Sequence, residues 1–294
     1  MYYLLVDGFN LAYRSFYAIP ELKRTDGFPT NALHGWLRTL WKLLDTQQPE
    51  RVCVFFDLGG AQDKLALHPE YKAQRKETPE ALVQQFPYIK TLSHACGWTV
   101  IEDNGIEADD LLASAALKLL AQGHRVGIVS ADKDFAQLVR PGLDQIIPPP
   151  TANPKLGWTS LDAQAVHAKF GVSPEQIPDY LALIGDSSDN IPGIPGVGPK
   201  TAVRWLEQWG HIAELLKHSD QVKPERFQPV LATSRALLEF NLKLVTLNSE
   251  CKLPTLDGHP AEISQLEKLL TELEMKTTLK EMHKRYGPPQ MMLL

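Results

Sequence analysis

Short apolar runs alternate with stretches of helical periodicity in the first half of the chain. The apolar runs lie at residues 2–6, 51–56, 98–102, 125–130 and, more weakly, 143–147. Between them, apolar side chains recur at helical spacing over residues 31–45, 79–95 and 108–121. Strands that alternate with helices favour a mostly parallel sheet covered by helices. The sequence therefore predicts an α/β fold for this half.

The pattern changes after a proline-rich connector, PPPTANPKLGW, at residues 148–158. The remainder contains no convincing strand pattern, so we place a domain boundary here, with an α/β domain at 1–158 and a helical domain at 159–294. One helix of the second domain is well marked. Ser173 and Gln176 form a capping box, with proline at the first helical position, and the helix ends at Gly185.

Acidic side chains recur where the apolar runs end. Asp7 closes YYLLVD, Asp57 closes VCVFFD, and Asp132 with Asp134 follows VGIVS. Ligands of open α/β sheets bind at the carboxyl ends of the strands. Carboxylates suit hard divalent ions, and so many like charges in one crevice repel unless cations or protons intervene. The nine acids of the predicted metal site are Asp7, Asp57, Glu107, Asp109, Asp110, Asp132, Asp134, Asp186 and Asp189.

Composition and charge are compatible with a soluble protein that binds a polyanion. The 294 residues are 44% hydrophobic, and no apolar run or basic leader indicates a membrane span or a signal peptide, so we expect a cytoplasmic protein. Three widely spaced cysteines do not favour a disulfide framework or a zinc cluster. Without the nine acids the formal charge changes from −5 to +4, and YKAQRK at 71–76 forms a compact basic run.

A glycine-rich loop at residues 193–198 precedes a second apolar-patterned helix. Glycines allow backbone to approach a ligand closely, and a helix start presents free amide groups, so the loop is suited to a nucleic-acid phosphate. Taken alone, the same residues fit an ordinary turn equally well. They do not form a nucleotide P-loop, because Pro199 precedes Lys200, and Asp7 lacks the second aspartate, two positions on, of an aspartyl-phosphate phosphatase.

Six segments together resemble the 5′ nuclease domain of bacterial DNA polymerase I and the flap endonucleases. They occur in the order and at the spacing of that family, and the resemblance runs from about residue 2 to about residue 287. The segments are LLVDG at 4–8, FFD at 55–57, YKAQR at 71–75, EADDLLAS at 107–114, SADKDFAQLV at 130–139 and GDSSDNIPGIPGVGPKTA at 185–202. Because polymerase I proteins continue into further domains, we expect a free-standing nuclease or an excised domain.

The resemblance implies a PIN-like α/β fold with a mostly parallel central sheet, a helical arch inserted at about 62–92, and a helix-hairpin-helix (helix-3-turn-helix) at about 185–209. It implies two Mg²⁺ or Mn²⁺ ions. Glu107 and Asp110 share one helix face whereas Asp109 points elsewhere, so some acids would bind metal through water. Asp110 is left unassigned. The first ion would take Asp7, Asp57, Glu107 and Asp109, and the second Asp132, Asp134, Asp186 and Asp189.

Cations and aromatic residues complete the implied site. Arg14, Lys72 and Arg75 would stabilise charge on the reacting phosphate, with Lys72 foremost. Tyr13 and Tyr71 would stack on unpaired bases, although Tyr13 also fits a core position. The resemblance also implies a K⁺ ion held by carbonyls of the glycine loop. The implied DNA-binding residues are Tyr13, Tyr71, Lys76, Gly193, Gly196, Val197, Gly198, Lys200 and Thr201.

One departure from the family concerns the arch. The usual Phe-Arg-His is replaced by Asp63-Lys64-Leu65, so flap handling is expected to differ while the metal chemistry is retained. The predicted activity is that of a monomeric 5′-3′ exonuclease and flap endonuclease that recognises duplex DNA junctions with a free 5′ end, alongside a DNA polymerase as a candidate partner. A PIN-like ribonuclease and a non-catalytic DNA-junction binder are the alternatives.

Overall fold

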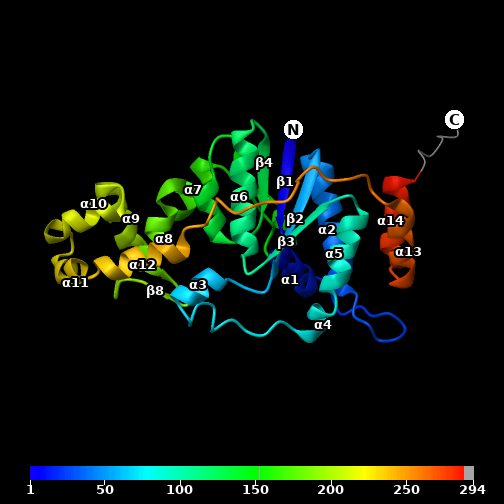
Figure 1. The fold of residues 1–294 in the computed structure, drawn as a ribbon, viewed down its shortest axis with the longest axis horizontal. Coiled ribbons are helices and arrows are strands. Elements are labelled where there is room, and N and C mark those ends of the chain that lie inside the picture. The colour runs from blue at the N-terminus through cyan, green and yellow to red at the C-terminus, as the bar shows by residue number, and fades with distance from the viewer. Residues whose placement is uncertain (152, 288–294) are drawn as a thin grey trace.

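A six-stranded sheet forms the centre of the computed structural model, which describes residues 1–151 and 153–287 (Figure 1). The strands are β1 (Tyr2–Asp7), β2 (Arg51–Leu58), β3 (Thr99–Asn104), β4 (Arg125–Val129), β5 (Leu143–Ile147) and β6 (Thr159–Leu161), in the order β3-β2-β1-β4-β5-β6. The first five are parallel, as predicted, and β6 is antiparallel to β5. The sequence did not indicate β6, because three residues at a sheet edge carry no hydrophobic period.

Both faces of the sheet are buried. Along β1, Leu4 and Val6 pack into one core cluster, and Tyr3 and Leu5 pack into another. Strands buried on both faces read as continuous apolar runs, which explains the pattern YYLLV. The first face is covered by α1 (Gly8–Ala18), α2 (Asn31–Gln47) and α5 (Phe86–Ala95), and the second by α6 (Ala108–Ala121).

The insertion after β2 contains two short helices, α3 (Gln62–Leu67) and α4 (Glu80–Val83), joined by residues 68–79. In Figure 1 it runs from the helical part of the molecule, beneath the sheet, to α5. Its position is that of the predicted arch, but its joining segment is irregular and its helices are only six and four residues long. This segment carries the predicted site residues Tyr71, Lys72 and Arg75.

A second core lies in the helical part and is built around Trp205 and Leu181. The predicted capping box is present at Ser173 and Gln176, and the chain leaves the helical state at Gly185, as expected. The elements are α7 (Ala163–Phe170), α8 (Ile177–Ile184), α9 (Pro199–Trp209), α10 (Ile212–Lys217), α11 (Gln228–Thr233) and α12 (Arg235–Val245), with a two-residue hairpin pair, β7 (Gly185–Asp186) and β8 (Ile191–Pro192).

The chain then returns to the sheet. Residues 246–262 cross the molecule, and α13 (Ile263–Glu272) and α14 (Lys276–Tyr286) lie beside α2 and α5 (Figure 1). Leu266, Leu270 and Met282 belong to the core cluster of the sheet. The sequence assigns 159–294 to one helical domain, but it also predicts that the amphipathic C-terminal segment LEKLLTELEMKTTL packs against the sheet domain. That packing is confirmed, because α13 and α14 pack on the α/β part. Residues beyond 287 lie outside the described chain. No helix among the described residues is long and apolar enough to cross a membrane.

Candidate active site

Asp7 is fixed by the junction between the first strand and the first helix. It ends β1 and caps α1, with Oδ1 accepting the Asn10 amide at 3.0 Å, while Oδ2 accepts the Ser130 hydroxyl at 2.7 Å. Gly8 makes this turn possible, because a Cβ at that position would lie 2.5 Å from the Phe55 carbonyl oxygen. The Asp7 carboxylate is therefore held at the carboxyl edge of the sheet.

Two further acidic groups are placed by the neighbouring strand and helix. Asp57, near the end of β2, accepts the Ala108 amide at 2.6 Å and so joins β2 to the start of α6. Glu107 is the N-cap residue of α6, and Asp109 lies in its first turn. Burial raises the pKa of Asp109, and the nearby charges of Asp7 and Asp132 raise it further.

A second group of carboxylates joins the sheet to the helical part. Asp134, Asp186 and Asp189 each offer one oxygen, and these oxygens all lie within 4.8 Å of one another. Asp134 is in the 3-10 turn after β4, where Asp132 accepts its amide at 3.0 Å. Asp186 and Asp189 come from the β7–β8 hairpin. These three are among the four acids that the family resemblance implies as ligands of the second ion.

Lysine and arginine side chains pair with the outer acids of the crevice. Lys72 donates to Glu107, Lys133 donates to Asp186 at 2.7 Å, and Arg75 donates to Asp189 at 2.7 Å. Burial raises the pKa of Glu107, but Lys64 and Lys72 outweigh it and hold this pKa below its usual range. In the same way Lys133 holds the pKa of Asp186 low against the effect of burial. The Glu107 and Asp186 carboxylates are therefore ionised at neutral pH.

The inner carboxylates behave in the opposite way. Burial, with the neighbouring Asp132 and Asp57, raises the pKa of Asp7 to about 6, and burial with Asp132 and Asp186 raises the pKa of Asp134 to about 7. The pKa of Asp109 is raised well above its ordinary value, chiefly by burial. Full ionisation of the inner group would therefore leave more negative charge than the protein's own cations neutralise, and protons are retained in its place.

One buried oxygen of the crevice leaves room for a further partner. Among the described residues, Asp134 Oδ1 is buried and accepts no hydrogen bond, and the Lys133 ammonium lies 3.8 Å from it. A buried carboxylate oxygen without a partner costs free energy unless a proton or a cation meets it. The oxygen-only donor set around it fits hard divalent ions.

The raised pKa values give a prediction for the metal-free protein. Unfolded aspartates release their protons near pH 4, whereas folded Asp7 and Asp134 keep theirs up to about pH 6 and 7. The folded state therefore binds more protons in this window, and its stability falls as pH rises. We expect the melting temperature in EDTA to be roughly 5 °C higher at pH 6 than at pH 8. Thermal melts at both values, repeated in saturating Mg²⁺, check this, and a melting temperature in EDTA that rises with pH would contradict it.

Two predicted residues occupy positions that differ from the expectation. Tyr71 is only 4% exposed, and its hydroxyl donates to Asp189 at 3.0 Å, so its ring is not available for stacking on a base in this conformation. Asp110 accepts the Asn248 amide at 2.8 Å and lies 3.7 Å from Lys64. Asp110 thus faces the returning C-terminal segment and the insertion.

The other predicted cationic and aromatic residues form no hydrogen bond or ion pair with the nine acids within the described residues. Arg14 lines a surface pocket with Arg38, Lys42 and Trp158. The Tyr13 hydroxyl is hydrogen-bonded to Thr78, which ties α1 to the insertion, and the ring packs against the core. Lys76 is exposed on the insertion.

The glycine loop is connected tightly to the second group of acids. Gly185 and Gly193 touch across the hairpin, since a Cβ on Gly193 would collide with the backbone of Ile184 and Gly185. Gly196 has φ +78°, and Gly198 caps α9. Lys200 is exposed and Thr201 is partly buried at the start of α9. The Val197 side chain is buried in the helical core, so this residue can offer a ligand its backbone only.

Sequence reasoning missed three polar residues of the site. Lys64 is buried, donates to Glu107 and lies above the Tyr71 ring. Lys133 pairs with Asp186, and Ser130 holds Asp7. Ser130 and Lys133 lie in the SADKD motif between recognised acids, which is a local signal. Lys64 stands where the family has an arginine, which indicates a cation at this position, but its pairing with Glu107 depends on how the insertion folds back.

Comparison with known proteins places this arrangement in a family. A family model described as the N-terminal resolvase-like domain of 5′-3′ exonuclease matches residues 2–171, and one described as the C-terminal SAM fold of 5′-3′ exonuclease matches residues 172–265. The chain belongs to the 5′-3′ exonuclease family. A 5′-3′ exonuclease of Aquifex aeolicus is 38% identical over 285 residues, which are 95% of this chain and 94% of that protein.

Longer relatives and solved structures agree with this family. DNA polymerase I of Bacillus caldotenax is 36% identical over 84% of the chain, which spans 28% of that polymerase. Among solved structures, a T5 5′-exonuclease with bound zinc matches with a TM-score of 0.69 at 23% identity, over 94% of this chain and 99% of that one. A T5 flap endonuclease in complex with DNA and metal ions also gives 0.69, at 22% identity, over 97% and 100%. These structures share the fold of this 5′-3′ exonuclease family member.

Proposed function

We propose that this chain is a structure-specific 5′ nuclease that hydrolyses DNA phosphodiesters near 5′ ends and at 5′-flap junctions and leaves 5′-phosphates. The observation that carries the proposal is the gathering of buried inner carboxylates that repel one another when ionised, among which Asp134 Oδ1 is buried without a hydrogen bond in the described chain and has Lys133 Nζ 3.8 Å away. Membership of the 5′-3′ exonuclease family supports the same reaction class.

Two divalent ions, Mg²⁺ or Mn²⁺, are the proposed cofactors. Asp7, Asp57, Glu107 and Asp109 would hold one ion, and Asp132, Asp134, Asp186 and Asp189 the other. Bound there, the ions would supply a water of lowered pKa and would stabilise charge on the reacting phosphate. Asp110 is not among the proposed ligands, because Asn248 and Lys64 already engage its carboxylate.

The chain's own cations would act on the substrate. Lys72 and Arg75 lie on the insertion with their charged groups at the acids, where a scissile phosphate would enter. Each can turn from its carboxylate to a phosphate oxygen once metal ions take over the acids. Arg14, on the neighbouring face, would contact the phosphate chain before the cut. Charge stabilisation of this kind accounts for much of phosphoryl-transfer catalysis.

The glycine loop would hold the duplex. The exposed backbone at Gly196, the partly buried backbone at Gly193 and Gly198, and the start of α9 at Lys200 and Thr201 would make phosphate contacts, with K⁺ bound by loop carbonyls. Such contacts carry no base information, so selectivity would come from the shape of the junction, and affinity would fall steeply with salt. We further propose a monomeric cytoplasmic enzyme of replication and repair that removes primers or flaps together with a DNA polymerase.

Cleavage of matched substrates tests the proposal. A 5′-labelled flap DNA, a blunt duplex, single-stranded DNA and an RNA of the same sequence are incubated with the protein in Mg²⁺ and in EDTA. We expect junction-selective cutting of DNA in Mg²⁺ and none in EDTA. Preferential cutting of RNA would favour a PIN-like ribonuclease instead. Tight junction binding without cutting in Mg²⁺ or Mn²⁺ would favour a non-catalytic binder.

A further inference from the structure

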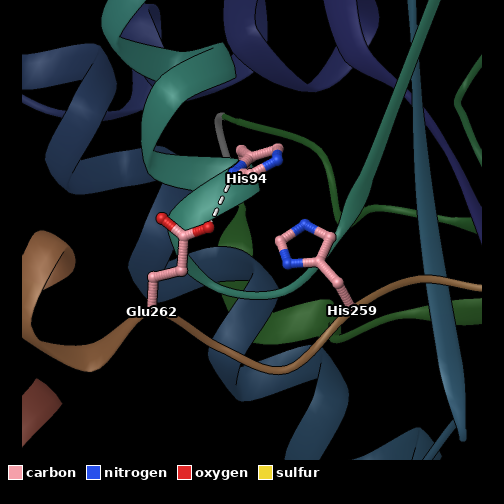
Figure 2. A group of neighbouring side chains, drawn as sticks. All are labelled: His94, His259 and Glu262. Carbon is pink, nitrogen blue, oxygen red and sulfur yellow. Dashed lines mark ion pairs between the residues drawn. The ribbon is translucent and has the colours of Figure 1, made fainter.

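A second group of metal-ligating side chains lies away from the acidic crevice. His94, at the end of α5, His259 and Glu262 point toward one another (Figure 2). One ligand atom from each lies within 4.8 Å of the other two. Two imidazoles and one carboxylate are donors typical of Zn²⁺, whereas Mg²⁺ prefers oxygen ligands alone.

The cluster lies at the edge of the sheet opposite the acids. Gly258 packs within 4 Å of Arg51 and Thr99, which begin β2 and β3, whereas the acidic crevice lies where the strands end. The crossing segment, residues 246–262, carries His259 and Glu262 and is the orange trace that runs over the sheet to α13 in Figure 1. A metal bound here would therefore be separate from the nuclease centre.

The geometry is already close to that of a coordinated ion. His94 Nδ1 lies 3.6 Å from Glu262 Oε1, and the rings of His94 and His259 have centroids 4.1 Å apart. Ligand atoms of a tetrahedral zinc site, at about 2.0–2.1 Å from the ion, lie about 3.3 Å from one another. The ligand atoms, which lie within 4.8 Å of one another, would therefore have to approach by at most about 1.5 Å, a movement that side-chain rotations can supply.

The hydrogen bonds of His259 leave one of its nitrogens free for a metal. Its Nδ1 lies 3.0 Å from the Pro260 carbonyl oxygen and must donate, because a carbonyl only accepts. In the neutral ring this leaves a lone pair on Nε2, and Nε2 is buried without a hydrogen-bond partner among the described residues. A histidine that donates its second nitrogen to a backbone carbonyl is the common arrangement at protein metal sites.

The backbone holds the three ligands together. The Glu262 amide donates to the carbonyl of Ala95, the residue after His94, at 2.8 Å. Gly97 allows the close approach, because a Cβ there would lie 2.6 Å from the His259 carbonyl oxygen. The ligands are thus presented by two segments that are already joined, which lowers the entropy cost of assembling the site.

We propose that His94, His259 and Glu262 form a zinc site that fastens the crossing segment to the end of α5 and so secures α13 and α14 on the sheet. The side chains of His94 and Glu262 are 56% and 49% exposed, so water completes the coordination. A ligand that binds the folded state alone stabilises it by mass action, and this site would raise stability without taking part in hydrolysis.

Titration calorimetry with ZnCl₂ tests the site, at about pH 7.5 with Mg²⁺ in excess to occupy the acidic crevice. Wild type is expected to show a zinc site whose affinity falls at least about tenfold in His259→Ala and in Glu262→Gln. His167→Ala, which removes an exposed histidine of α7, is the matched control and should leave zinc binding unchanged. With zinc at 100 times its Kd, the melting temperature of wild type should rise by about 5 °C, and that of His259→Ala should not.

Equal zinc affinity in wild type, His259→Ala and Glu262→Gln would overturn the proposal. Circular dichroism verifies the fold of each variant, and His94→Gln replaces an exposed side chain if His259→Ala does not fold. Mg²⁺-dependent DNA cleavage should be unchanged in all three variants. A loss of cleavage in a correctly folded variant that still binds zinc as tightly as wild type would also overturn it.

Discussion

Replacement of Asp134 by asparagine is expected to reduce Mg²⁺-dependent cleavage of a 5′-flap DNA by about 1000-fold or more, which corresponds to about 4 kcal/mol of transition-state stabilisation. Asparagine keeps the shape of the side chain but removes the charge that would meet a cation held together with Asp186 and Asp189. Single-turnover cleavage under excess enzyme measures the chemical step. Binding of the junction DNA should be retained, because the substitution removes a negative charge that faces a polyanion.

The same substitution should stabilise the metal-free protein. Burial and like charges raise the pKa of Asp134 to about 7, so its ionised form is destabilising at neutral pH. We expect the melting temperature in EDTA to rise by about 3 °C in Asp134→Asn. Asp103→Asn is the matched control, since Asp103 is an exposed acid at the end of β3, at the same edge of the sheet. If Asp134→Asn cut the flap at a rate near that of wild type, Asp134 would not be a metal ligand.

Replacement of Lys72 by alanine is expected to slow cleavage by about 100- to 1000-fold, as the loss of one transition-state cation does elsewhere. The Lys72 side chain is 20% exposed, lies 4.9 Å from the centroid of the Tyr71 ring and pairs with Glu107. This largely desolvated ammonium would act strongly on a phosphate in the crevice. Single-turnover rates at saturating DNA measure the effect, with Lys76→Ala as the matched control on the same segment.

A purely structural role for Lys72 has a different kinetic signature. If Lys72 served only to orient Glu107, its loss would raise the Mg²⁺ concentration that gives half the maximal rate, and excess Mg²⁺ would restore cleavage. Lys72→Arg keeps the charge and should recover part of the activity. A Lys72→Ala rate within about threefold of wild type would remove Lys72 from the catalytic groups.

The sheet and its acids were predictable because they depend on local patterns. Leu4 and Val6 face one core and Tyr3 and Leu5 the other, and a strand buried on both faces leaves a continuous apolar run with Asp7 at its end. Parallel strands then bring such ends to one edge whatever the details of packing. The position of the acids followed from this rule, whereas their pairing with particular cations did not.

The missed features depend on contacts between distant parts of the chain. Lys64 lies 43 residues from Glu107, and nothing in the pattern of the insertion shows that its side chain turns inward. The amphipathic pattern of α13 predicts a helix with one apolar face, but it does not identify α5 as the surface that this face covers. The burial of Tyr71 could not be predicted from the sequence around it. The Tyr71 hydroxyl is buried because it donates a hydrogen bond to Asp189, which is 118 residues away along the chain.

The insertion, the hairpin and the acids are linked by backbone contacts. The Lys72 amide donates to the Asp189 carbonyl at 3.2 Å, and His68 bonds to the carbonyl of Asn190 at 3.0 Å. Asp189 therefore belongs at once to the metal cluster, to the anchorage of the insertion and to the hairpin that leads into the glycine loop. Thermodynamic linkage makes such a connection reciprocal. Ions bound at the acids would favour the loop geometry that grips a duplex, and a gripped duplex would favour ions. Ion binding, and with it cleavage, would thus be favoured on substrates that the glycine loop can hold and disfavoured on others.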